Sequence, residues 1–145
     1  MINSYTSTTQ NAGINVPLIF NTNKIKTGCT VTHSEGSSTF SLNKPGFYFV
    51  TLKATGSTTA TTGDLTIQMY QNGVAVVDAI STESSTATTD INTLNFATIV
   101  QVKPSCCAVD NQTSLTFINT GVAATYTNVS VTITKLCWGD WYVSI

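Results

Sequence analysis

Short segments with alternating apolar and polar residues recur along the chain, and clusters of Gly, Asn, Ser and Thr separate them. This alternation is typical of half-buried strands, and we find no segment whose pattern predicts a helix. The predicted strands are 16–22, 38–42, 46–54, 64–71, 74–80, 90–103, 113–119 and 127–136, with a short extended piece through Val31. The pattern therefore predicts an all-β, two-sheet antiparallel jelly-roll sandwich of about 8–10 strands.

Two of these segments carry specific signals. Asn72 and Gly73 lie between two predicted strands, and this dipeptide is suited to the positive-φ positions of a tight hairpin turn. The segment 46–54 places Tyr48 on one face and Phe47 and Phe49 on the other, so we expect a central strand that is covered on both faces near its start. The Ser/Thr-rich stretches 56–63 and 81–89 are expected to be loops.

Three motifs follow one another at a spacing found in a known family. They are Leu18-Ile-Phe-Asn-Thr22, Phe40-Ser-Leu42 and Pro45-Gly-Phe-Tyr-Phe-Val50, and the segment 129–136 closes the pattern. In this order they resemble the complement C1q-like branch of the tumour-necrosis-factor-like jelly rolls. The resemblance covers residues 14–136, which leaves 1–13 as an N-terminal arm and 137–145 as an aromatic tail.

The resemblance implies a homotrimer whose subunits bury aromatic side chains around a threefold axis. The residues that it assigns to this trimer core or interface are Phe20, Phe47, Tyr48 and Phe49. The pieces Thr27-Gly-Cys29 and Ser105-Cys-Cys107 also look like those of a bacterial and bacteriophage subset, which comprises virion and spore-surface proteins. The chain departs from secreted animal members in lacking a collagen-like stalk, a signal peptide and an acidic calcium cluster.

Charge narrows the range of partners. Only 9% of residues are charged, and the six basic residues are all Lys, for a net charge of −1. Such a chain lacks the basic surface that binds a phosphate backbone, so we expect no nucleic-acid partner. No apolar run approaches the length of a membrane span, and Met1-Ile-Asn-Ser-Tyr5 does not begin a signal peptide. We therefore expect synthesis in the cytoplasm without membrane insertion, unless a longer precursor is trimmed.

Few residues are suited to catalysis or metal binding. One His and seven carboxylates offer little for an active site, and we predict that the chain is not an enzyme. An extended chain would hold His33 and Cys29 roughly 13 Å apart, too far for a nucleophilic pair. A zinc site formed by Cys29, His33, Cys106 and Cys107 is one hypothesis. The alternatives are an exposed His33 and thiols, including Cys137, that pack, stay reduced or form disulfides.

Aromatic residues in the tail and hydroxyls in the loops are the remaining candidates. Trp138, Trp141 and Tyr142 either dock the domain onto a neighbour or fold back over its own sandwich. Loops on a rigid scaffold often bind partners, here a glycan or protein receptor. The candidate ligand-binding residues are Thr58, Thr59, Thr61, Thr62, Ser84, Ser85 and Thr88.

These features favour a non-enzymatic, trimeric structural or adhesive head on the surface of a particle. A bacteriophage virion is the leading location, as a fibre head, decoration or receptor-binding protein that contacts other virion proteins. A bacterial spore or cell surface is the alternative. A soluble lectin-like or regulatory protein is the second hypothesis, and a redox or metal enzyme that uses the thiols is the third.

Overall fold

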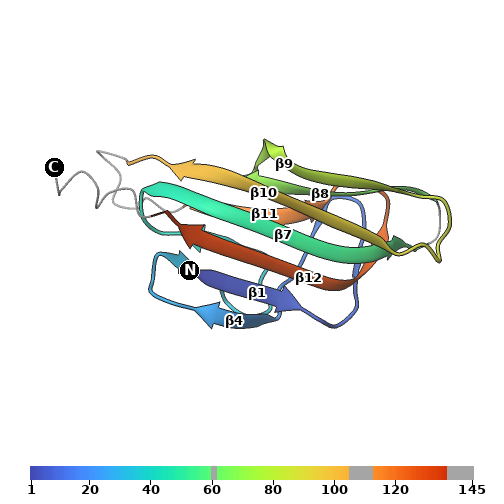
Figure 1. The fold of residues 1–145 in the computed structure, drawn as a ribbon, viewed down its shortest axis with the longest axis horizontal. Coiled ribbons are helices and arrows are strands. Elements are labelled where there is room, and N and C mark those ends of the chain that lie inside the picture. Colours follow the sequence, from blue (N-terminus) through green and yellow to red (C-terminus); the bar gives the residue numbers. More distant parts are fainter. Residues whose placement is uncertain (60–61, 105–112, 137–145) are drawn as a thin grey trace.

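The computed structural model describes residues 1–59, 62–104 and 113–136, which form two antiparallel sheets packed face to face (Figure 1). The predicted all-β jelly roll is confirmed, and the described residues contain no helix. The described residues contain more strands than the expected 8–10, and four of these strands have only two or three residues. The twelve strands are β1 (Ile2–Thr6), β2 (Gln10–Ala12), β3 (Val16–Pro17), β4 (Thr22–Lys26), β5 (Val31–Thr32), β6 (Phe40–Leu42), β7 (Gly46–Thr58), β8 (Gly63–Gln71), β9 (Val74–Ser85), β10 (Asn92–Val102), β11 (Thr113–Asn119) and β12 (Ala124–Lys135).

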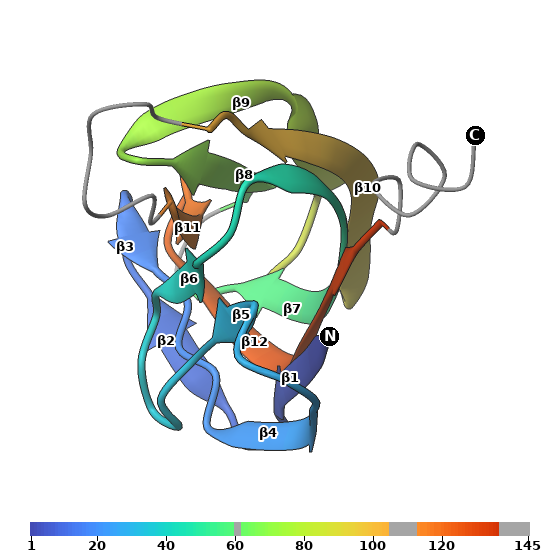
Figure 2. The same cartoon turned by 90° about the vertical axis from the view of Figure 1, so that its left-hand side faces the viewer.

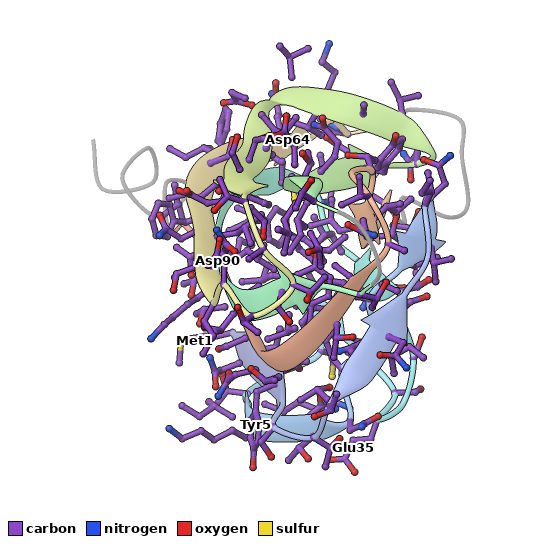
Figure 3. The ribbon with its side chains drawn as sticks, turned by 90° about the vertical axis from the view of Figure 1, so that its right-hand side faces the viewer. Met1, Tyr5, Glu35, Asp64 and Asp90 are labelled. Carbon is purple, nitrogen blue, oxygen red and sulfur yellow. The ribbon has the colours of Figure 1, made fainter. Side chains whose placement is uncertain are left out.

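The strand order is that of a two-sheet sandwich. The first sheet runs β10-β7-β12-β1-β4, with β2 also paired to β12, and the second runs β5-β6-β11-β8-β9, with β3 paired to β11. Viewed from one end, the sheets enclose a single interior (Figure 2). Side chains fill this interior, whereas Tyr5, Glu35 and Asp64 lie at the periphery (Figure 3).

The core follows from the alternation along the long strands. Tyr48, Val50 and Leu52 of β7 point inward and are buried, and the inward residues of β12 face the same interior. At the second sheet, the Phe20 and Phe40 rings meet edge to face with centroids 5.1 Å apart, and Phe117 lies against both. Such edge-to-face contacts add to the gain from area burial. The Asn72-Gly73 turn is confirmed, with φ of 52° and 79°.

The expected N-terminal arm over residues 1–13 is instead part of the first sheet. Strand β1 pairs with β12 on one side and with β4 on the other. The inward residues Ser4 and Thr6 are polar, so the segment lacks a strong apolar alternation, and their hydroxyls donate to Asn23 Oδ1 and to the Ile19 carbonyl. Hydrogen bonding rather than apolar patterning thus places this strand.

Other predicted segments also differ from the structure, and the expected loop 56–63 begins within β7, which continues to Thr58. Residues 16–22 are not one strand, since β3 ends at Pro17 and Phe20 makes only an isolated bridge to Ser37. Strand β9 does not end at Ile80 but continues to Ser85, because residues 81–85 pair with β8 through polar cross-strand contacts such as Thr66 Oγ1 to Thr82 Oγ1 at 3.0 Å.

Candidate functional site

His33 organises one end of the second sheet. Its ring stacks on Phe40 with the ring centroids 4.2 Å apart. His33 is buried, with 4% of its surface exposed. Nδ1 lies 2.7 Å from Asn23 Oδ1, and Nε2 lies 2.8 Å from the Ser37 carbonyl oxygen. Asn23 is oriented by its Nδ2, which donates to the His33 carbonyl at 2.8 Å. His33 therefore ties β4 and the 34–37 turn to the aromatic core.

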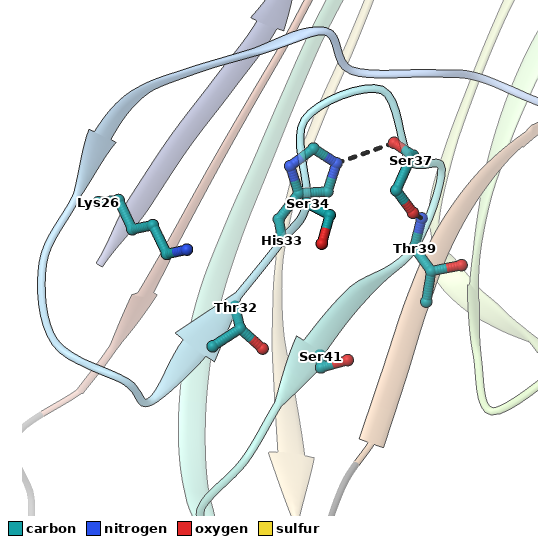
Figure 4. A pocket seen from close by; sticks show the side chains of 7 residues that line it. All are labelled: Lys26, Thr32, His33, Ser34, Ser37, Thr39 and Ser41. Carbon is teal, nitrogen blue, oxygen red and sulfur yellow. Dashed lines mark hydrogen bonds between the residues drawn. The ribbon is translucent and has the colours of Figure 1, made fainter.

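A polar hollow of about 270 Å³ opens beside this ring (Figure 4). We call it the hydroxyl pocket; its lining is Lys26, Thr32, His33, Ser34, Ser37, Thr39 and Ser41. Thr32 of β5 pairs in register with Ser41 of β6, so their side chains lie together on one face. Lys26 comes from the edge strand of the other sheet. Sequence reasoning did not identify this pocket.

The state of His33 should make stability depend on pH. Burial lowers the pKa of His33 and outweighs the hydrogen bond to the Ser37 carbonyl, which raises it, while Lys26 lowers it and Glu35 raises it. A lowered pKa in the folded state means that the unfolded chain binds the proton more readily below its ordinary pKa of about 6.5. The contribution of neutral His33 to the free energy of unfolding is therefore fully present above pH 6.5, and it decreases as the pH falls below that value.

Thermal melts between pH 7 and pH 5 test this expectation, and the melting temperature should fall across that range. His33 is the only histidine of the chain, so His33→Gln should remove the slope even though it lowers the melting temperature itself. A melting temperature that rises as pH falls would contradict this expectation. It would mean that the Asn23 and Ser37 oxygens stabilise the charged ring more than burial destabilises it.

The structure describes only two of the four proposed zinc ligands, Cys29 and His33. Cys29 is exposed, and both nitrogens of His33 already face protein oxygens in a buried position. His33 would have to break these contacts to bind a metal, so its assignment as a ligand, like the alternative of an exposed His33, is wrong for this conformation. Cys106, Cys107 and Cys137 lie outside the described residues, and the described residues hold no group of three or more His, Cys, Asp or Glu able to hold a metal.

The four aromatic residues assigned to a trimer interface fall into two classes. Phe20 and Tyr48 have no exposed surface in the single chain, because they fill its own core, and this corrects their assignment as contacts to a neighbour. Tyr48 also donates its hydroxyl to the Lys44 carbonyl. Phe47 and Phe49 point out of the first sheet, each 40% exposed, so the expectation that both faces of β7 are covered does not hold within one chain.

The outward residues Phe47, Phe49 and Ile99 form what we call the outer apolar patch. Phe49 pairs with Ile99 of β10 on one side and with Thr134 of β12 on the other. Ile99 is 56% exposed. Paired residues of neighbouring strands share a face, so Phe49 and Ile99 present one apolar surface at the outer side of the sandwich.

Further along the same outer face lies a second hollow of about 410 Å³. Its lining is Asn3, Tyr5, Ser7, Lys24, Asn128 and Ser130. Tyr5 of β1 pairs with Ser130 of β12, which places this hollow two strands away from β10.

The edge strand β9 carries further exposed apolar residues, Val74, Val77 and Ile80.

The predicted ligand-binding residues divide by exposure. Thr58 and Ser85 lie in strands and are buried, so they are not available to a ligand. Thr59, Thr62, Ser84 and Thr88 are exposed, whereas Thr61 lies outside the described residues.

The turn that contains Thr88 is held by one carboxylate. Asp90 Oδ2 accepts hydrogen bonds from Thr86 Oγ1 at 2.9 Å, Thr86 N at 3.0 Å and Ala87 N at 3.1 Å. These hydrogen bonds lower the pKa of Asp90, and the bond from the Thr86 hydroxyl has the largest effect. The turn is thus locally ordered.

The docking tail falls outside the described residues. Trp138, Trp141 and Tyr142 belong to this segment, so both hypotheses for the tail remain predictions. Among the residues that the structure describes, no helix is long and apolar enough to cross a membrane.

Comparison with known proteins adds evidence on the fold. No family model matches the chain, and no curated protein matches it by sequence. Three solved structures are similar in fold. Eiger TNF from S. frugiperda has a TM-score of 0.65 at 13% identity, covering 94% of this chain and 92% of that one. PRD1 vertex protein P5 has a TM-score of 0.55 at 14% identity, with 90% and 93% covered. Murine APRIL at pH 5.0 has a TM-score of 0.55 at 10% identity, with 93% and 98% covered. The TM-scores support a tumour-necrosis-factor-like jelly-roll fold, and the low sequence identities support no finer conclusion.

Proposed function

Because the chain has the tumour-necrosis-factor-like jelly-roll fold, we propose that it is a non-enzymatic structural and binding domain that assembles as a homotrimer. The observation that carries this proposal is the outer apolar patch, where Phe49 and Ile99 stand together on the outside of a sheet. Large side chains that stay exposed in one chain are typical of interfaces, in which aromatic residues are enriched. The C1q-like motifs identified in the sequence imply the same assembly.

A ring of identical subunits needs two different surfaces on each copy, because every subunit meets its neighbours through opposite sides. The outer apolar patch supplies one surface. The β9 edge supplies a candidate for the other, since Val74, Val77 and Ile80 are exposed along it. Few charges oppose this packing, because only 9% of all residues are charged.

The location that we propose is the surface of a bacteriophage virion, where the domain would serve as a fibre head, decoration or receptor-binding protein. The jelly-roll fold shared with the PRD1 vertex protein P5 supports this location, as do the phage-like Cys pieces of the sequence. A spore or bacterial cell surface is the alternative supported by the same pieces.

Native mass and particle labelling test the two parts of the proposal. Three copies of the 15.4 kDa chain should give about 46 kDa in native mass spectrometry. An antibody against the folded domain should label intact virions, with virions from a strain lacking the gene as the control. A 15.4 kDa species at micromolar concentration would contradict the trimer, and unlabelled virions would contradict the location.

A further inference from the structure

The hydroxyl pocket holds unused hydrogen-bonding groups on a fixed backbone. Ser34, Thr39 and Ser41 make no side-chain hydrogen bond to any other described residue. The Thr32 hydroxyl accepts one hydrogen bond, from Asn43 Nδ2 at 3.1 Å, and keeps its own proton available for donation. Several groups that can each donate and accept thus line one small hollow.

One positive charge stands over these hydroxyls. Lys26 is exposed and makes no ion pair within the described ranges, and the pocket lining contains no carboxylate. Glu35 is the nearest acidic neighbour in sequence, and its Oε1 accepts a hydrogen bond from the Asn23 backbone at 3.0 Å. The pocket therefore combines neutral hydrogen-bonding groups with an ammonium group that makes no ion pair with a described residue.

The backbone that carries the pocket is already ordered. Ser37 N donates to the Ser34 carbonyl at 3.0 Å, and Gly36 N donates to the Phe20 carbonyl at 2.9 Å. The His33 ring closes the turn through Ser37 and is packed on Phe40. A ligand would meet groups that need little ordering, which reduces the entropy cost of binding.

We propose that the hydroxyl pocket binds one acidic monosaccharide unit. The ring hydroxyls of the sugar would exchange hydrogen bonds with the Ser and Thr hydroxyls, and its carboxylate would pair with the Lys26 ammonium group. A volume of about 270 Å³ suits a single sugar rather than a longer chain. The lining contains no Tyr, Trp or Phe, so charge rather than stacking would provide selectivity. The site lies within one subunit and goes beyond the proposed assembly.

Lys24 provides a matched control for Lys26. Both lysines lie on β4, but the register shift in the β1–β4 pairing leaves Lys24 as the extra residue. Lys24 lines the second hollow, whereas Lys26 lines the hydroxyl pocket. Lys26→Met and Lys24→Met therefore remove the same charge from the same strand but from different hollows.

The experiment titrates the full ¹⁵N-labelled chain with glucuronate, glucose and acetate and follows the amide resonances. Glucuronate should shift Thr32, Ser34, Thr39 and Ser41 with millimolar affinity, while glucose, which lacks the carboxylate, and acetate, which lacks the ring, should each bind at least about tenfold more weakly. Lys26→Met should weaken glucuronate binding about tenfold, and Lys24→Met less than about twofold.

Three results would overturn the proposal. Equal binding of acetate and glucuronate would identify a simple anion contact, and equal binding of glucose would remove the role of the charge. An equal loss in both lysine variants would indicate unspecific attraction. Native mass recorded on the same samples reports assembly separately, so a monomeric chain that still binds glucuronate at these residues would contradict only the trimer.

Discussion

Replacing Asn119 with Ala should destabilise the domain by about 3–5 kcal/mol, because this side chain joins segments of both sheets. Its Nδ2 lies 3.1, 3.0 and 3.0 Å from the carbonyl oxygens of Ala12, Gly13 and Val122, and its Oδ1 accepts the Tyr126 hydroxyl at 3.0 Å. Both Asn119 and Tyr126 are buried. Truncation removes this partner from the Tyr126 hydroxyl and the Ala12 carbonyl at buried positions, and it removes one hydrogen bond each from the part-buried Gly13 and Val122 carbonyls.

Urea unfolding at one fixed protein concentration measures this loss. Asn21→Ala is the control, since Asn21 is exposed and its side chain makes no hydrogen bond to a described residue, and it should cost less than about 0.5 kcal/mol. Asn119→Asp should lower the free energy of unfolding at least as much near pH 7. An ionised carboxylate cannot donate to the carbonyl oxygens, and its burial without a partner is unfavourable. A loss for Asn119→Ala no greater than that of the control would show that water replaces these bonds.

Strands with local signals were predictable. The Asn72-Gly73 pair determines its turn through backbone conformation, and the alternation in 46–54 identified the central strand β7. Strand β1 was missed because two of its three inward residues, Ser4 and Thr6, are polar and form hydrogen bonds to groups distant in sequence. Tertiary hydrogen bonds therefore decided a strand that apolar patterning could not reveal.

The first residues of β7 do not by themselves determine its orientation, because aromatic side chains occupy both faces there. Further along, Val50 and Leu52 alternate with Lys53, so the strand as a whole indicates that Tyr48 points inward. The neighbouring strand agrees, because Val50 pairs with Ile133 of β12 and both are buried. Phe49 is thereby left on the outer face.

The candidate site was predictable only in part. Val31 and His33 are both buried, whereas Cys29 precedes the short strand β5 and is exposed, so the burial of His33 did not follow from the sequence. Thr32 and Ser34 are two positions apart, as are Thr39 and Ser41, so each pair would share one face of an extended chain. This spacing was a usable signal for an outward row of hydroxyls around the Glu35-Gly36 turn. The contribution of Lys26 was not predictable, because it depends on how the edges of the two sheets meet.

Replacing Ile99 with Glu should dissociate the proposed trimer while leaving the subunit folded. Ile99 points outward from β10, so the new carboxylate is solvated in the single chain and disturbs no core residue. In a threefold assembly each subunit would place one carboxylate against an apolar neighbour, and burying an unpaired charge costs several kcal/mol per ion. The trimer dissociation constant should therefore rise by at least about a hundredfold.

Native mass spectrometry and sedimentation across a concentration series measure this effect, with circular dichroism as the check on folding. Ile14→Glu is the matched control, because Ile14 is similarly exposed, at 63%, but lies on the turn before β3, away from the outer face. The control should remain at about 46 kDa while Ile99→Glu shifts to 15.4 kDa. If Ile99→Glu instead keeps the full trimer mass at low micromolar concentration, the subunits meet through another surface. The outer apolar patch would then remain open to a different protein of the particle.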